Sequence, residues 1–219
     1  MTTPYHALIF DMDGVLADSE PVYHAAMLSV LQPLGHTLTE EQQRHVMGLG
    51  IEDCWRYLAA SLNLQGPTEH LVSAYNDELL VRLAQVHETL PGVRGLIDAL
   101  RQRNIPIAVA SSSLPDWIEA LLGGIELLDA FDALVSRRMV ANGKPAPDIY
   151  LHAARLLKAD PARCIAIEDT PNGLASAVAA GMLAVQVRAA STAFPPLPNA
   201  HLVLDSLLDF PLALLDAPS

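Results

Sequence analysis

The stretch Ala7-Leu-Ile-Phe-Asp-Met-Asp-Gly-Val-Leu16 is the part of the chain that decides its fold. Its first four residues are apolar, which is typical of a short strand buried on both faces of a parallel sheet. Asp11 and Asp13 follow directly, and Gly14 allows the backbone to turn sharply after them. Because ligands of open parallel sheets bind beyond the carboxyl ends of the strands, we expect both aspartates at a binding site.

Further strand-like runs occur along the chain. They are predicted at residues 105–110, 133–135, 164–167 and 183–187, with 201–204 as a candidate last strand. From residue 91 onward amphipathic helical patterns alternate with these runs, which is typical of a doubly wound α/β sheet. Residues 18–87 show helical patterns only, including a capping box at Thr39-Glu-Glu-Gln42. The sequence therefore predicts a Rossmann-like doubly wound parallel core (1–17 and 88–219) with an inserted all-α helical cap domain (18–87).

Composition narrows the class of protein. The chain has 219 residues, of which 51% are hydrophobic, so it can bury a sizeable core. Its net charge of −12 argues against nucleic acid or an anionic membrane as partner, since both require clustered Lys and Arg. No uncharged window is apolar enough for a membrane span, and Asp11 interrupts any signal peptide. We expect a cytoplasmic monomer in which Cys54 and Cys164 are buried free thiols.

Polar side chains follow three later strands as well. Ser111-Ser112-Ser113 follows the second strand, Gly143-Lys144-Pro145 comes shortly after the third, and Glu168-Asp169-Thr170 follows the fourth. Carboxylates, hydroxyls and a lysine should therefore meet at one edge of the sheet, which is the set of groups that phosphoryl transfer needs. Converging carboxylates repel one another, and Mg²⁺ is the natural counter-charge because it prefers oxygen ligands.

The chemistry of these groups can be argued from the residue types. One carboxylate can attack phosphorus to form an aspartyl-phosphate. A second can protonate the leaving alkoxide and then deprotonate water. Each motif alone has a plainer interpretation, since turns favour Asp and Gly and Glu168-Asp169 could cap a helix. An EF-hand is excluded because Gly14 is fourth rather than sixth in the loop. Their common place at strand ends favours the functional interpretation.

The motifs resemble those of the haloacid dehalogenase-like hydrolase superfamily, and most of all its β-phosphoglucomutase-like phosphatase branch with a helical cap. The matching segments are Asp11-Met-Asp-Gly-Val-Leu16, Asp18-Ser-Glu-Pro21, Val109-Ala-Ser-Ser112, Gly143-Lys-Pro-Ala-Pro-Asp-Ile-Tyr150 and Ile167-Glu-Asp-Thr-Pro-Asn-Gly173. The resemblance implies a Mg²⁺-dependent phosphatase that hydrolyses a small phosphorylated metabolite, a sugar or polyol phosphate, through an aspartyl-phosphate.

The resemblance also implies a role for each site residue. Asp11 would be the nucleophile and Asp13 the general acid and base. The groups implied to hold Mg²⁺ are the Asp11 carboxylate, the Asp13 backbone carbonyl and Asp169, with Glu168 assisting directly or through water. The residues implied to bind phosphate are Ser111, Ser112 and Lys144. Haloacid dehalogenases and phosphonate hydrolases of the superfamily lack an aspartate at the position of Asp13, so both are disfavoured.

The cap departs from the mutase pattern. Where the mutase has a Lys and an Arg that grip the second phosphate of its substrate, the alignment places Met47 and Ile51. A histidine that follows the Asp-Ser-Glu-Pro motif in many members is replaced by Tyr23, with His24 next. These differences favour hydrolysis of a monophosphate. A β-phosphoglucomutase-type sugar phosphomutase is the alternative. A third hypothesis is a non-catalytic sensor of phosphorylated metabolites, but the chain has every type of catalytic residue, which disfavours a sensor.

Overall fold

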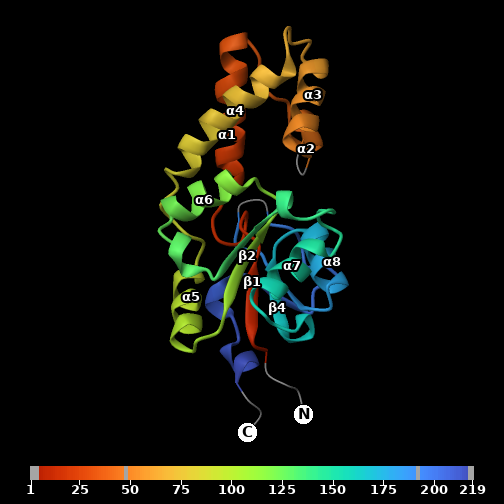
Figure 1. The fold of residues 1–219 in the computed structure, drawn as a ribbon. Helices are drawn as coiled ribbons and strands as arrows, with labels where there is room; N and C mark the ends of the chain where they lie inside the picture. Colours follow the sequence, from red (N-terminus) through yellow and green to blue (C-terminus); the bar gives the residue numbers. More distant parts are fainter. Residues whose placement is uncertain (1–4, 47–48, 191–192, 217–219) are drawn as a thin grey trace.

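The computed structural model describes residues 5–46, 49–190 and 193–216. Its strands form one parallel sheet in the order β3-β2-β1-β4-β5-β6. The strands are β1 (Ala7–Phe10), β2 (Ile107–Ser111), β3 (Ala133–Ser136), β4 (Cys164–Glu168), β5 (Leu183–Val187) and β6 (Leu202–Leu204). The first strand therefore lies at the centre of the sheet, between β2 and β4, as Figure 1 shows.

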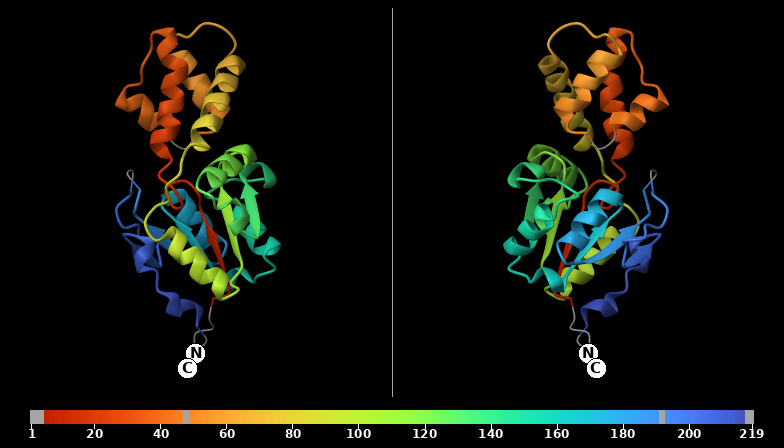
Figure 2. Two further views of the ribbon diagram at one scale, coloured as in Figure 1. Left: turned by 90° about the vertical axis from the view of Figure 1, so that its left-hand side faces the viewer. Right: turned by 90° about the vertical axis from the view of Figure 1, so that its right-hand side faces the viewer.

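Helices cover both faces of the sheet. On one face α5 (Val93–Gln102) and α6 (Pro115–Gly124) pack on Leu8, Phe10 and the residues level with them. On the other face lie α7 (Asp148–Leu156) and α8 (Pro171–Ala179), which pack on the small core around Ala7 and Ile9. Figures 1 and 2 show the two layers on opposite sides of the strands. This is the doubly wound α/β core that the alternation of strand and helix patterns predicts.

Four helices form a separate layer beyond the carboxyl ends of the strands (Figures 1 and 2). They are α1 (Glu20–Leu31), α2 (Glu40–Val46), α3 (Ile51–Ser61) and α4 (Thr68–Leu83), all inserted between β1 and α5. The predicted capping box is present, since Gln42 N donates to Thr39 Oγ1 at 3.2 Å and Thr39 N donates to Gln42 Oε1 at 3.0 Å. This helical layer rests on the core where α4 meets α6, and Trp117 Nε1 donates to Asn76 Oδ1 there at 2.7 Å.

The second strand begins two residues later than predicted, at Ile107 rather than Ile105. Pro106 has no backbone N–H and so cannot donate to the ladder of a central strand. Its carbonyl still accepts from Leu8 N at 3.1 Å. Cys54 and Cys164 are buried and free, as predicted. Within the described parts of the chain, no helix combines the length and the apolar character that crossing a bilayer requires.

Candidate active site

The order of the strands brings the predicted site residues together. Asp11 follows β1, and its backbone N–H donates to Ile167 O at 2.9 Å in β4. Ser111 ends β2 on one side of it, and Glu168 ends β4 on the other. The site therefore lies at the carboxyl ends of adjacent parallel strands, where such sheets bind ligands.

Lys144 is the cation at the centre of this site. Its Nζ forms an ion pair with Asp11 Oδ1 and a second one with Glu168 Oε1 at 2.6 Å, and it donates to Ala110 O at 2.9 Å. Its side chain is only 6% exposed. Burial lowers the pKa of Lys144, but the charges of Asp11 and Glu168 outweigh burial, and the net shift is upward. The ammonium group is thus held in its charged form.

The pKa of Asp11 is raised well above its ordinary value. Burial is the largest cause, and the charges of Glu168, Asp169 and Asp13 add to it, whereas Lys144 opposes it. An ionised Asp11 therefore depends on positive charge beside it, which Lys144 supplies in part.

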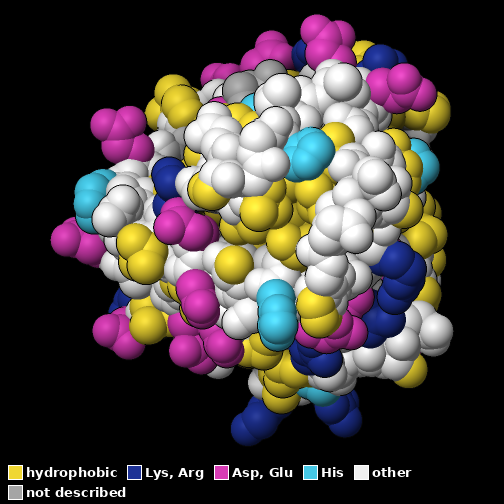
Figure 3. All heavy atoms as spheres, turned by 90° about the horizontal axis from the view of Figure 1, so that it is seen from above, with side chains coloured by type: hydrophobic (Ala, Val, Ile, Leu, Met, Phe, Trp, Pro, Cys, Tyr) yellow, Lys and Arg dark blue, Asp and Glu magenta, His cyan; other side chains and the backbone are white. Residues whose placement is uncertain are grey.

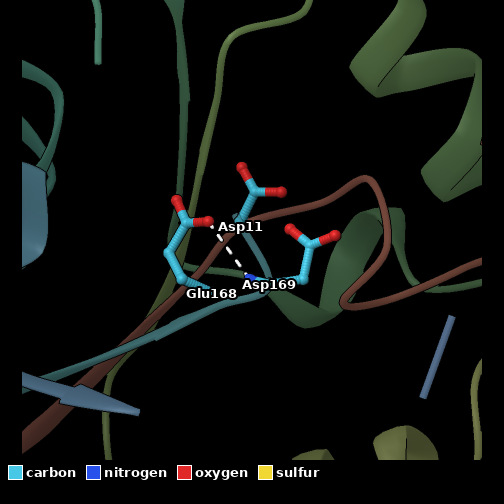
Figure 4. A group of neighbouring side chains, drawn as sticks. All are labelled: Asp11, Glu168 and Asp169. Carbon is cyan, nitrogen blue, oxygen red and sulfur yellow. Dashed lines mark hydrogen bonds between the residues drawn. The ribbon is translucent and has the colours of Figure 1, made fainter. Parts of the chain in front are cut away.

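Glu168 has both carboxylate oxygens engaged. Oε1 accepts from Tyr150 OH at 2.6 Å in addition to Lys144, and Oε2 accepts from Thr170 Oγ1 at 3.2 Å and from Asp169 N at 3.3 Å. The dashed line in Figure 4 marks the last of these bonds. A Cβ at Gly173, in the first turn of α8, would lie 1.9 Å from this carboxylate. Glu168 is therefore fixed on every side and orients Lys144.

Asp169 differs from Glu168 because one of its oxygens has no partner. Asp169 Oδ1 is buried without a hydrogen bond in the described structure. Burial, followed by the charge of Glu168, raises the pKa of Asp169 to about 8. Ligand oxygens of Asp11, Glu168 and Asp169 lie within 4.8 Å of one another, and Figure 4 shows the three carboxylates side by side. An all-oxygen group with an unsatisfied carboxylate fits a hard divalent cation.

Asp13 faces two hydroxyl groups rather than the lysine. Its Oδ1 accepts from Ser19 Oγ at 2.5 Å, and its Oδ2 accepts from Ser113 Oγ at 2.9 Å. Ser19 immediately precedes α1, and Ser113 lies in the loop after β2. Tyr23 OH, on α1, lies 3.1 Å from Ser113 Oγ. Asp13 is therefore held between the core and the first helix of the cap.

The two serines predicted to bind phosphate have different surroundings. Ser111 is fully buried, and its Oγ accepts from Ser113 N at 3.0 Å, so its hydroxyl hydrogen is left for another acceptor. Ser112 is exposed beside it. The predicted residues thus gather at one edge of the sheet, although Asp13 and Lys144 point to different partners.

Several residues that shape the site were not assigned a role in it from the sequence. They are Tyr150 and Thr170 beside Glu168, and Ser113, Ser19 and Tyr23 around Asp13. Apart from Tyr23, each belongs to or directly follows one of the motif segments quoted in the sequence analysis. Position in a motif was therefore an available signal for four of them. Tyr23 approaches from the cap, and no local pattern shows that contact.

Gly14 has a more specific role than permitting a turn. Its φ is +77°, and a Cβ there would lie 2.2 Å from Asp169 Oδ2. The sequence predicted a sharp turn here, and the structure shows in addition that the Asp169 carboxylate lies against this glycine. The glycine therefore keeps Asp169 close to Asp11.

We expect Gly14→Ala to lower the free energy of unfolding by about 2–4 kcal/mol, because left-handed strain and steric overlap add together. Urea denaturation measures this loss. Gly35→Ala is the matched control, since Gly35 has φ +80° but a Cβ there would meet no described atom within 4 Å. The control should lose about 1–2 kcal/mol, from strain alone. Equal losses in the two variants would show that the contact with Asp169 is unimportant.

Comparisons with known proteins agree on one family. Residues 5–181 match the model of the family described as haloacid dehalogenase-like hydrolase. The chain is 36% identical over 210 residues to a Drosophila melanogaster protein named probable pseudouridine-5'-phosphatase (92% of this chain, 90% of that protein). It is 34% identical to hexitol phosphatase B of Escherichia coli (86% and 87%) and 31% identical to β-phosphoglucomutase of Bacillus subtilis (95% and 93%).

A solved structure shows the same architecture. The crystal structure of CbbY from Rhodobacter sphaeroides in complex with phosphate has a TM-score of 0.82 and 28% identity, covering 97% of this chain and 99% of that one. Fold and site together define a capped α/β hydrolase with an acidic, lysine-bearing centre. The chain belongs to the haloacid dehalogenase-like hydrolase family. Within that family it is a phosphomonoester hydrolase.

Proposed function

We propose that the protein is a Mg²⁺-dependent phosphatase that hydrolyses a small phosphomonoester, a sugar or polyol phosphate, through an aspartyl-phosphate on Asp11. The observation that carries the proposal is the buried group of Asp11, Lys144, Glu168 and Asp169 at the carboxyl ends of β1 and β4. We further propose 1–17 and 88–219 as the catalytic core and 18–87 as a cap that excludes water and selects the leaving group.

Asp11 and Asp13 divide the reaction between them in this proposal. A carboxylate oxygen of Asp11 attacks phosphorus while the bond from phosphorus to the leaving oxygen breaks. Asp13 gives its proton to that oxygen, and the freed alcohol departs. Asp13 then takes a proton from the water that attacks the aspartyl-phosphate, so that inorganic phosphate forms and Asp11 is restored.

The phosphate oxygens are held by groups on neighbouring strand ends. Lys144 neutralises part of their charge, and the Ser111 hydroxyl and the Ser112 backbone donate hydrogen bonds to them. Support for this assignment comes from Ser111 Oγ, which accepts one bond and keeps its own hydrogen free to donate. The place of Ser112, exposed directly after the end of β2, also suits a group that meets substrate.

The carboxylates fit a Mg²⁺ ion. We assign direct ligation to Asp11, Asp169 and the backbone carbonyl of Asp13, and an indirect role to Glu168, whose oxygens already accept hydrogen bonds. When bound, Mg²⁺ supplies positive charge that offsets the phosphoryl oxygens and the converging carboxylates. The unsatisfied Asp169 Oδ1 is the feature of this chain that most favours a bound cation.

The charge of the cap favours a monophosphate over a bisphosphate. Residues 18–87 contain three arginines and no lysine against nine Asp and Glu residues. Arg56 and Arg82 form ion pairs with Asp53 and Glu78, and Arg44 Nε donates to Glu40 O. Figure 3 shows acidic side chains distributed over this end of the molecule. Only Arg44 of these three has no carboxylate partner among the described contacts, so a second phosphate would meet little positive charge in the described cap, which counts against the phosphomutase alternative.

The two mutase positions give different information. Met47 lies outside the described residues. Ile51 begins α3 and packs, half-buried, against the main hydrophobic core. An isoleucine there cannot neutralise the negative charge of a second phosphate, in agreement with the hydrolase proposal.

The proposed function is tested by phosphate release from p-nitrophenyl phosphate with and without Mg²⁺, followed by a panel of sugar, polyol and nucleoside monophosphates. Mg²⁺-dependent release supports the proposal. A mutase would instead interconvert two sugar monophosphates when primed with the bisphosphate. A folded protein that binds phosphorylated metabolites without turnover would support the sensor hypothesis.

We expect Mg²⁺ to raise the melting temperature of the wild type by about 5–10 °C at a hundredfold excess over its Kd, and that of Asp169→Asn by much less. Because burial raises the pKa of Asp169 to about 8, Mg²⁺ must displace a proton at neutral pH, so its affinity should rise with pH up to that value. For the same reason, the neutral Asn should not destabilise the metal-free protein. Asp129→Asn, an exposed carboxylate on the core, is the control. Equal Mg²⁺ stabilisation of all three proteins would contradict the assignment.

A further inference from the structure

A line of hydrogen bonds connects the cap to Asp13. Tyr23, on α1, places its OH 3.1 Å from Ser113 Oγ, and Ser113 Oγ lies 2.9 Å from Asp13 Oδ2. We call Tyr23, Ser113 and Asp13 the hydroxyl chain. It crosses from the cap helix to a loop of the core and ends on the proposed acid and base.

The direction of the hydroxyl chain follows from counting hydrogens. Ser113 has one hydroxyl hydrogen, and it points that hydrogen at Asp13 Oδ2, 2.9 Å away. Ser113 therefore donates to Asp13 and must accept from Tyr23. Burial, then the negative charge of Asp13, raises the pKa of Tyr23 well above its ordinary value, so this phenol keeps the hydrogen that it donates.

Two hydroxyls thus fix the Asp13 carboxyl group. Ser19 donates to one oxygen at 2.5 Å and Ser113 to the other. Without the bond from Tyr23, the Ser113 hydroxyl would be free to turn about its Cβ–Oγ bond toward other acceptors. One of the two restraints on Asp13 would then be weakened, with no group near phosphorus removed.

Aromatic packing holds Tyr23 in place. Its ring lies 5.9 Å from that of Trp117 on the core helix α6, and Trp117 also contacts Tyr75 on α4, at 6.1 Å. The Trp117 indole is anchored by its hydrogen bond to Asn76. The position of the Tyr23 hydroxyl therefore depends on the cap resting on α6.

The neighbouring histidine does not share this role. His24 Nε2 lies 2.8 Å from Gln43 Nε2 on α2, within the cap. The sequence comparison placed Tyr23, with His24 next, where many members of the family have a histidine. In the structure Tyr23 OH lies beside Ser113, which hydrogen-bonds to Asp13, whereas His24 contacts Gln43 on α2.

We propose that Tyr23 is a positioning residue that orients Asp13 through Ser113 when the cap is seated on the core. The inference rests on the proposed role of Asp13. In the first step the bond from phosphorus to the leaving oxygen breaks, its electron pair stays on that oxygen, and the oxygen takes the proton of the Asp13 carboxyl group. A well-oriented Asp13 matters most when the leaving group needs that proton.

Tyr23→Phe tests the proposal because it removes one hydroxyl and keeps the ring. We measure kcat/KM on p-nitrophenyl phosphate, whose anion leaves readily, and on phenyl phosphate. Phenol has a pKa of about 10, so departure of its anion benefits from protonation. The expected loss is about tenfold on phenyl phosphate and less than about twofold on p-nitrophenyl phosphate. A structural defect would lower both values alike, and that result would overturn the proposal.

Ser113→Ala supplies the second arm. If Tyr23 acts through Ser113, Tyr23→Phe should cause no further loss on phenyl phosphate in the Ser113→Ala background. An undiminished loss there would overturn the proposal. Tyr5 lies before β1, at the opposite edge of the sheet, and Tyr5→Phe is the control, which should leave kcat/KM on both substrates unchanged.

A folded wild type that hydrolyses neither substrate would overturn the proposed function and this inference together. An active wild type with an unchanged Tyr23→Phe variant would overturn the inference alone.

Discussion

Asp11→Asn is expected to lower kcat by about a thousandfold or more, because the amide cannot attack phosphorus and the covalent route is lost. The variant should still fold. Burial raises the pKa of Asp11 well above its ordinary value, so a neutral side chain at this position does not add to the cost of burying charge. Steady-state release of phosphate measures the loss of turnover, and a urea titration measures stability.

A trapping experiment separates loss of the nucleophile from general damage. Acid quenching of the wild type during turnover should leave phosphate on Asp11, identified by mass spectrometry and released by hydroxylamine, and Asp11→Asn should carry none. Asp98→Asn, an exposed carboxylate on α5, serves as the control and should behave as the wild type. Full activity of Asp11→Asn, or phosphate trapped on another residue, would remove Asp11 from the proposed role.

Lys144→Met is expected to lower the free energy of unfolding by about 3–5 kcal/mol at neutral pH. The ammonium group is nearly buried and pairs with both Asp11 and Glu168, so its removal leaves two adjacent carboxylates without a counter-charge. Activity should fall by at least about a hundredfold, since Asp11 would favour its protonated form and the phosphate would lose a cation. Chemical denaturation and kcat/KM on p-nitrophenyl phosphate measure the two effects.

The pH dependence of the Lys144→Met variant has a definite sign. Lys144 lowers the pKa of Asp11 in the wild type, so its loss raises that pKa further. A folded state that binds more protons than the unfolded state becomes less stable as pH rises. The destabilisation should therefore grow from acid toward neutral pH. Lys158→Met, at the other lysine of the sequence, is exposed and should show neither effect. A pH-independent loss would indicate a packing defect.

Much of the fold was predictable because its signals are local. Runs such as 7–10 and 183–187 are short and mostly apolar, and both are strands with the predicted bounds. Residues 18–87 carry only the helical period, and the structure contains helices α1–α4 there. The late start of β2 was missed because the apolar pattern includes Ile105, whereas the hydrogen-bond ladder excludes Pro106.

Which residues make up the candidate site was also predictable, because of the topology of the sheet. Parallel strands all end at the same edge of the sheet, and the site residues lie there: Ser111 and Glu168 end strands, Asp11 and Asp169 directly follow strands, and Lys144 lies in the segment after β3. The cap approaches this edge from outside the sheet, so the contact of Tyr23 with Ser113, 90 residues away, has no counterpart in any local pattern.

The sequence by itself determined which chemical groups stand at the ends of the strands, because strand ends are set by neighbours along the chain. Tertiary structure alone decided how those groups are paired. It placed Lys144 between Asp11 and Glu168 and left Asp169 Oδ1 unsatisfied. It also placed the hydroxyls of Ser19 and Ser113 within hydrogen-bond distance of Asp13, and Tyr23 OH beside Ser113. The physical reason is that ion pairs and hydrogen bonds act over a few ångströms. Residues far apart in the sequence come within that distance only when the strands have their order in the sheet and the cap is packed on the core.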